Sequence, residues 1–118
     1  MARILIVDDD VLSTKIYLAK LNNDHHEVVL CQNGQDALAK IITKFDLVLL
    51  DMIMPDKNGR EVFLEILSIN PDAKVIIASG FSRNEDVAGL KEKGLCAFLP
   101  KPFQRSELSR IIGEVLNR

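Results

Sequence analysis

Short apolar runs alternate five times with longer stretches in which apolar residues recur at helical spacing, and this alternation limits the chain to a β/α architecture. Three of the runs, residues 4–7, 47–50 and 75–78, are wholly apolar, as is typical of parallel strands covered by helices on both faces. The predicted strands are residues 3–7, 27–31, 46–50, 74–78 and 96–99.

Each predicted helix follows a strand, and the first four carry a start or end signal in the sequence. Asn22-Asn23 ends the first helix, Asn33-Gly34 precedes the second, and Asn70-Pro71 ends the third, because a residue before proline is pushed out of helical dihedrals. Gly94 is expected to end the fourth helix. The apolar residues that mark the helices are Leu12, Ile16, Ala19 and Leu21, then Ala37, Leu38, Ile41 and Ile42, then Val62, Phe63, Ile66, Leu67 and Ile69, then Val87 and Leu90, and finally Leu108, Ile111, Ile112, Val115 and Leu116.

Five parallel strands joined by right-handed helical crossovers form a doubly wound α/β sheet with helices on both faces. A chain of 118 residues with 47% hydrophobic residues can bury one core, so we expect a single domain over residues 1–118. Ligands of such sheets bind at the carboxyl ends of the strands, where the winding direction reverses. The chemistry of this chain should therefore lie at that edge.

Charge and hydropathy exclude several classes of function. The net charge of −2, without a basic block, argues against direct binding of nucleic acid. No apolar run approaches the roughly 20 residues of a membrane-spanning helix, and no leader precedes Ile4, so we expect no membrane insertion and a cytoplasmic location. Cys31 and Cys96 are expected to be small buried thiols, and His25-His26 to be a solvated turn rather than a metal site.

Polar side chains follow four of the five predicted strands. Asp8, Asp9 and Asp10 come after the first strand, and Asp51 comes after the third. Ser79 and Lys101 follow the fourth and fifth; the second strand has no such group. Each residue alone has an ordinary explanation, since acids cap helices, serine starts loops and lysine before proline is common in turns. Their coincidence at one sheet edge favours a shared site, although Asp10 is expected to cap the first helix.

Carboxylates gathered at one edge require a compensating cation, because two of them at 4 Å repel by roughly 4 kcal/mol at an effective dielectric near 20. A small set of aspartate oxygens suits Mg²⁺, which keeps several waters and commonly shares its ligand shell with a phosphate. With Mg²⁺ and Lys101 neutralising phosphoryl oxygens, an aspartate can attack phosphorus in line and become an acyl phosphate.

These residues resemble those of the receiver domain of two-component response regulators, and the resemblance covers the whole chain. The matching stretches are residues 4–10, 49–59, 78–80 and 97–103. The resemblance implies the flavodoxin-like strand order 2-1-3-4-5, of which a chemotaxis regulator of this family is a standard example. It also implies a signalling domain that catalyses its own phosphorylation and dephosphorylation rather than a conventional enzyme.

The resemblance assigns the site residues. It implies that Asp51 is the phosphoacceptor, that Asp8 and Asp9 form the acidic pair, and that Lys101 contacts the phosphoryl group. The Mg²⁺ site would comprise this pair, Asp51 and the main-chain carbonyl of Ile53, with Asp9, Asp51 and Ile53 as the direct ligands.

The resemblance also implies a switch and partners. Ser79 would move to the phosphoryl oxygen and free space for the Phe98 ring, changing the surface of the fourth helix, fifth strand and fifth helix. The phosphoryl donor would be a histidine kinase or a histidine phosphotransfer protein, with a downstream effector domain or protein. The Lys101-Pro102 peptide is expected to be cis. Residues 94–97 lack the acidic pair that one transcription-factor branch uses for dimer contacts, so we expect a monomer or weak dimer.

Two other functions remain open at this point. A phosphohydrolase of the haloacid dehalogenase type would use Asp8 as nucleophile and Asp10 as acid and base. A receiver fold that serves only as a docking module would take up no phosphate.

Overall fold

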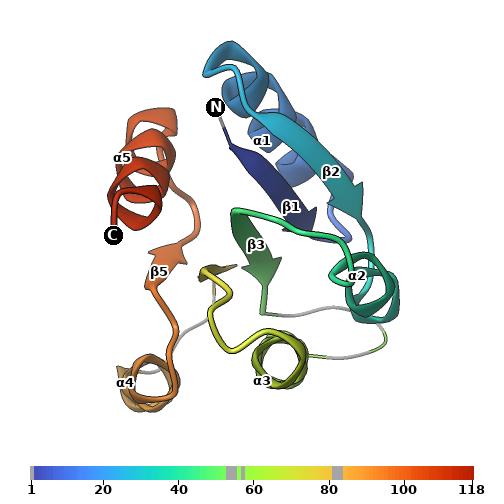
Figure 1. Cartoon of the computed structure of the whole chain (residues 1–118). Helices are drawn as coiled ribbons and strands as arrows, with labels where there is room; N and C mark the ends of the chain where they lie inside the picture. Colours follow the sequence, from blue (N-terminus) through green and yellow to red (C-terminus); the bar gives the residue numbers. More distant parts are fainter. Residues whose placement is uncertain (1, 53–55, 57, 81–83) are drawn as a thin grey trace.

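The computed structural model describes the chain except for residues 1, 53–55, 57 and 81–83 and the side chains of residues 84–87. Its single sheet has five parallel strands in the order β2-β1-β3-β4-β5, which confirms the predicted doubly wound α/β fold (Figure 1). The strands are β1 (Arg3–Val7), β2 (Glu27–Cys31), β3 (Leu47–Asp51), β4 (Val75–Ser79) and β5 (Ala97–Pro100). The helices are α1 (Val11–Asn23), α2 (Gly34–Lys40), α3 (Gly59–Ile69), α4 (Asn84–Glu92) and α5 (Arg105–Leu116).

Two apolar clusters cover the two faces of the sheet. Successive residues of β1 point to opposite faces, so Leu5 and Val7 pack under α2, α3 and α4, whereas Ile4 and Ile6 pack under α1 and α5 (Figure 1). All four side chains are completely buried. The wholly apolar strand runs are therefore a consequence of coverage on both faces.

Strand boundaries differ slightly from the prediction. The strands β3, β4 and β5 each begin and end one residue later than predicted. The residues before them still bond to neighbouring strands, since Asp46 donates its backbone N–H to Arg3 O at 2.8 Å and Cys96 donates to Val75 O at 3.0 Å. The shift therefore reflects only which hydrogen-bonded residue is counted as the first residue of each strand. It brings Asp51 and Ser79 into the last positions of their strands.

The predicted end signals are confirmed. Asp10 caps α1 by accepting from the Leu12 N–H at 3.1 Å. Gly94 has a φ of +116°, and the Leu95 N–H that follows returns to Leu90 O, which closes α4. Asn70 follows α3 and donates its N–H to Ile66 O. Local chemistry therefore sets these helix ends.

Four apolar residues predicted to mark helices lie elsewhere than expected. Ile42 falls after α2 and is 80% exposed, because α2 ends at Lys40, whose carbonyl accepts from both the N–H and the hydroxyl of Thr43. In α1, Leu12 is 71% exposed. The inward face of α1 is formed by Tyr17 and Leu21. Ile16 and Ala19, which also helped to identify α1, are exposed as well.

The histidine turn is only partly solvated, which corrects the prediction. His25 is exposed with a φ of 64°, whereas His26 is half-buried and its Nδ1 accepts from the Ala2 N–H at 3.1 Å. That bond requires an unprotonated Nδ1. Burial lowers the pKa of His26 below its ordinary value of 6.5.

Because the pKa of His26 is lowered in the folded protein, the free energy of unfolding depends on pH. As pH falls through about 6.5 the unfolded chain takes up a proton before the folded chain does, so the stability present above that pH is lost on acidification. The His26→Asn variant keeps an acceptor near the place of Nδ1 but cannot titrate, and should lose less stability than the wild type between about pH 8 and about pH 5.5. Urea midpoints at both pH values measure this. His25→Asn, at the exposed neighbour, serves as the control; equal losses in all three proteins would contradict the assignment.

Candidate functional site

Three aspartates from two strand ends meet at the carboxyl edge of the sheet, as predicted. Asp8 follows β1 and is 1% exposed, Asp9 is exposed, and Asp51 is the half-buried last residue of β3. One carboxylate oxygen from each lies within 4.8 Å of the other two. Residues more than forty positions apart in the sequence therefore form one acidic cluster.

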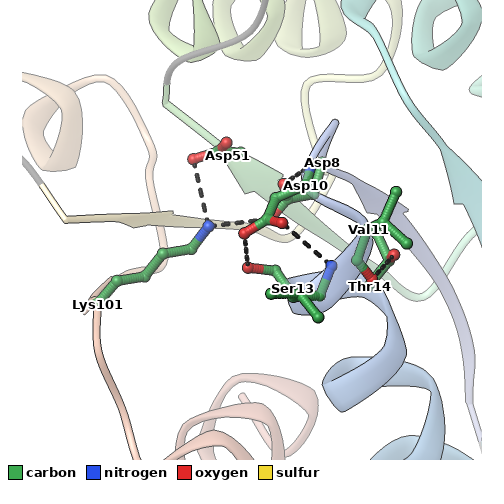
Figure 2. Close-up of polar contacts among 8 residues, drawn as sticks. Asp8, Asp10, Val11, Ser13, Thr14, Asp51 and Lys101 are labelled. Atoms are coloured by element: carbon green, nitrogen blue, oxygen red, sulfur yellow. Dashed lines mark hydrogen bonds and ion pairs between the residues drawn. The ribbon is translucent and has the colours of Figure 1, made fainter.

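Lys101 brings a positive charge into this cluster. Its Nζ lies 3.0 Å from Asp8 Oδ2 and 3.6 Å from Asp51 Oδ1, and its extended side chain reaches between the two carboxylates (Figure 2). The backbone N–H of Lys101 donates to Ser79 O at 2.9 Å, which fixes the start of this side chain beside the end of β4. The Lys101-Pro102 peptide is cis, which confirms that prediction.

The predicted switch residues lie on the two adjoining strands. Ser79 ends β4 at the same edge and is 2% exposed. Phe98 pairs in register with Ile77, and its half-buried side chain packs against the apolar cluster under α2, α3 and α4. The remaining predicted site residue, Ile53, lies outside the described residues.

Asp10 has a separate role from the acidic cluster. Its carboxylate accepts from the Leu12 N–H at 3.1 Å and from the Ser13 hydroxyl at 2.8 Å, and these bonds lower the pKa of Asp10. Figure 2 shows this carboxylate directed toward the first turn of α1. Asp8 in turn accepts from the Asp10 N–H at 2.8 Å, which orders the turn between β1 and α1.

The donor set fits Mg²⁺. The ligands of an octahedral Mg²⁺ lie about 3 to 4 Å apart, since each metal–oxygen bond is about 2.1 Å, so oxygens within 4.8 Å of one another need only a small contraction. The cluster holds three carboxylates, and the Lys101 ammonium group lies against two of them, which leaves an excess of negative charge for a divalent cation to neutralise. Asp8, Asp9 and Asp51 are the described residues that could hold it.

Sequence reasoning missed the aromatic contact beside this site. Tyr17 of α1 is 1% exposed and stacks on Phe103, with ring centroids 5.5 Å apart. Burial, together with nearby carboxylates, raises the pKa of its hydroxyl. Next to this pair lies a cavity of about 360 Å³, lined by Ser13, Ile16, Gly80, Lys101, Pro102 and Phe103. The sequence signal for this packing is Phe103, an aromatic residue two positions after Lys101.

The structure is thus a doubly wound α/β domain with an acidic cluster and a lysine at the carboxyl edge of its sheet, the edge at which domains of this class bind their ligands. The family model of the response regulator receiver domain matches residues 4–113, and the chain belongs to this family. It is thus a receiver domain of two-component response regulators.

Relatives and solved structures agree with this assignment. The chain is 35% identical over 118 residues to the transcriptional regulatory protein CpxR of Klebsiella pneumoniae, covering 100% of this chain and 50% of that protein. It thus spans about half the length of the curated relatives it matches first. A CheY-like receiver domain from Methanospirillum hungatei superposes with a TM-score of 0.93 at 30% identity, covering 99% of this chain and 94% of the other. The response regulator TrrA of Thermotoga maritima, solved in complex with Mg²⁺ and BeF, superposes with a TM-score of 0.87 at 30% identity, covering 98% and 99%.

Proposed function

We propose that this chain accepts a phosphoryl group on Asp51 in a Mg²⁺-dependent reaction and passes the signal on through its α4-β5-α5 surface. The observation that carries the proposal is the meeting of Asp8, Asp9 and Asp51 within 4.8 Å, with Lys101 Nζ 3.6 Å from the acceptor carboxylate. Receiver domains in general use Mg²⁺ at such an acidic pocket. Here the cation would be held by Asp9, Asp51 and the carbonyl of Ile53, with Asp8 beside it.

The chain's own residues account for the transfer step. An Asp51 carboxylate oxygen forms a bond to phosphorus while the bond from phosphorus to the donor's histidine nitrogen breaks, and that nitrogen keeps the electron pair. Lys101 already lies between Asp8 and Asp51 and is placed to neutralise a phosphoryl oxygen that arrives on Asp51. Mg²⁺, when bound, supplies further neutralisation of the phosphoryl charge.

The proposed donor is a histidine kinase or a histidine phosphotransfer protein, and the proposed receiver of the signal is a downstream effector domain or protein. Receiver domains in general pair with kinases and effectors of these kinds. We propose that Ser79 approaches the phosphoryl group and that Phe98 responds by repacking, because Ser79 ends β4 at the site and Phe98 lies on β5, which pairs with β4 and forms part of the α4-β5-α5 surface. Phe98 has no hydroxyl, so its two positions would differ in packing alone.

We further propose that residues 1–118 act as one domain, as a monomer or weak dimer, in the cytoplasm. Within the part of the chain that the structure describes, none of the helices combines the length and apolar character needed to cross a bilayer. Both cysteines are free, with Cys31 buried and Cys96 half-buried.

The alternative phosphohydrolase mechanism is less well supported. It requires Asp8 as nucleophile, but Asp8 is 1% exposed and its Oδ2 lies 3.0 Å from the Lys101 ammonium. It also requires Asp10 as acid and base, but both oxygens of Asp10 accept hydrogen bonds from the first turn of α1. Phosphate uptake distinguishes a passive docking module from the proposed phosphoacceptor domain.

Phosphate uptake tests the proposal. The wild type incubated with acetyl phosphate and Mg²⁺ should gain one acid-labile phosphate, detected by intact mass, and Asp51→Ala should gain none because the attacking oxygen is missing. Asp8→Ala should retain a reduced level, since it weakens only the surroundings of the acceptor.

The rival functions give different results in the same assay. A dehalogenase-type enzyme would lose all uptake in Asp8→Ala and keep it in Asp51→Ala. A docking module would show no uptake in the wild type. Either outcome would exclude Asp51 as the acceptor.

A further inference from the structure

Asp56 connects the segment after β3 to the beginning of α2. Its Oδ1 accepts from the Gly34 N–H at 3.1 Å and its Oδ2 from the Gln35 N–H at 3.0 Å. Asn33 accepts from the Asp36 N–H at 2.8 Å, so the first three N–H groups of α2 all have side-chain acceptors. Asn33 is adjacent to the helix in sequence, whereas Asp56 comes from a segment more than twenty positions away.

The beginning of α2 is itself connected to the acidic cluster. Two residues before Asn33, β2 ends at Cys31, whose carbonyl accepts from the Asp8 N–H at 3.0 Å. Asp56 follows Asp51 by five positions. Asp8 and Asp51 are therefore joined by two routes: directly through the pairing of β1 with β3, and indirectly through β2, the start of α2 and Asp56.

We infer that Asp56 is a positioning residue for the phosphoryl-transfer site. By its own contacts with the start of α2, Asp56 fixes the chain five positions after Asp51 and so helps to keep the acceptor aspartate in place relative to Asp8 and Asp9 before a cation binds. This inference rests on the proposed function, because it concerns the same acidic cluster.

The physical reason is preorganisation. Three carboxylates with oxygens within 4.8 Å repel one another, so the cluster tends to spread wherever the backbone that carries it is free to move. The β3–β4 pairing holds Asp51 against Ala78, but the β1–β3 pairing on the side of Asp8 ends one residue earlier, where Val7 pairs with Leu50. The two contacts of Asp56 fix the chain again at that residue, and a site held in its binding geometry loses less free energy on taking up its ligand.

A purely structural role would make Asp56 only a cap of α2, and Asn33 provides the matched control. Asn33→Ala and Asp56→Ala each remove side-chain caps from the same helix, but only Asp56→Ala removes a contact made by a residue that follows the acceptor in the chain. Asp56→Asn keeps one carbonyl oxygen as an acceptor and should have an intermediate effect.

Magnesium affinity measured by isothermal titration calorimetry, with no phosphodonor present, tests the inference. Asp56→Ala should bind Mg²⁺ about tenfold more weakly than the wild type, Asp56→Asn about threefold more weakly, and Asn33→Ala with wild-type affinity. The rate of phosphate uptake from acetyl phosphate should fall in the same order. Thermal midpoints of the Mg²⁺-free proteins should fall similarly in Asn33→Ala and Asp56→Ala, because both lose caps of α2.

The outcomes separate this inference from the proposed function. A wild type that neither binds Mg²⁺ nor takes up phosphate would refute the proposed function itself. A wild type that does both, with Asp56→Ala indistinguishable from Asn33→Ala in Mg²⁺ affinity, would overturn only the role of Asp56. If Asp56→Ala does not fold, wild-type Mg²⁺ affinity in Asp56→Asn overturns it instead.

Discussion

The Lys101→Ala variant is expected to lose about 3 kcal/mol of unfolding free energy when Mg²⁺ is absent, in line with the cost of removing one partner of a buried ion pair. Lys101 Nζ lies 3.0 Å from Asp8, whose side chain is 2% exposed, and 3.6 Å from Asp51. Without Lys101, the cluster of three carboxylates loses the ammonium group that lies between Asp8 and Asp51. Urea unfolding in the presence of a chelator measures the loss.

Mg²⁺ should restore much of that stability, because a divalent cation in the acidic cluster neutralises the charges that Lys101 no longer reaches. Arg110→Ala provides a control, since it breaks an exposed ion pair with Glu114 and should cost less than about 1 kcal/mol with no response to Mg²⁺. A Lys101→Ala protein as stable as Arg110→Ala in chelator would show that the lysine is not what balances the cluster.

The second large effect is expected at Gly59, the first residue of α3. A Cβ at this position would lie 2.5 Å from the carbonyl oxygen of Asp51 and 2.7 Å from Met52 Cα, and both are backbone atoms that cannot rotate away. Gly59 also donates its N–H to Met52 O at 2.6 Å. Gly59→Ala should therefore destabilise the protein by about 3 kcal/mol and weaken Mg²⁺ binding, since the backbone of the acceptor has to shift.

Gly113 provides the matched comparison for Gly59. It lies within α5 with no atom within 4 Å of an added Cβ, so Gly113→Ala should stabilise the protein by about 0.5 to 1 kcal/mol through helix propensity. Thermal and urea unfolding of both variants, with Mg²⁺ titrations, give the comparison. Equal stability of the two alanine variants would mean that the close approach of Gly59 to Asp51 is not required.

The acidic cluster could be predicted because strand order and strand direction decide it. Asp8, Asp9 and Asp51 follow apolar runs that form neighbouring parallel strands, and parallel strands bring their carboxyl ends to one edge. The burial of the individual acids could not be predicted in the same way. Asp8 is 1% exposed and Asp9 is exposed, although they are adjacent and their carboxylates belong to the same cluster.

The packing of α1 shows why an apolar pattern can identify a helix without identifying its buried face. Leu12 and Ile16 helped to predict the helix, yet they lie outside, while Tyr17 and Leu21 face the sheet. The rotation of the helix about its axis depends on its neighbours. The stacking of Tyr17 on Phe103 involves a residue from the far end of the chain.

Local sequence was sufficient to determine the β/α alternation, most helix ends and the set of acids and the lysine at one sheet edge, because apolar periodicity, caps and strand direction depend on near neighbours. Tertiary structure alone decided which acid is buried, which face of α1 turns inward, and that Asp56 reaches α2. These depend on contacts between segments twenty or more positions apart, whose distances are set by the packing of helices on the sheet.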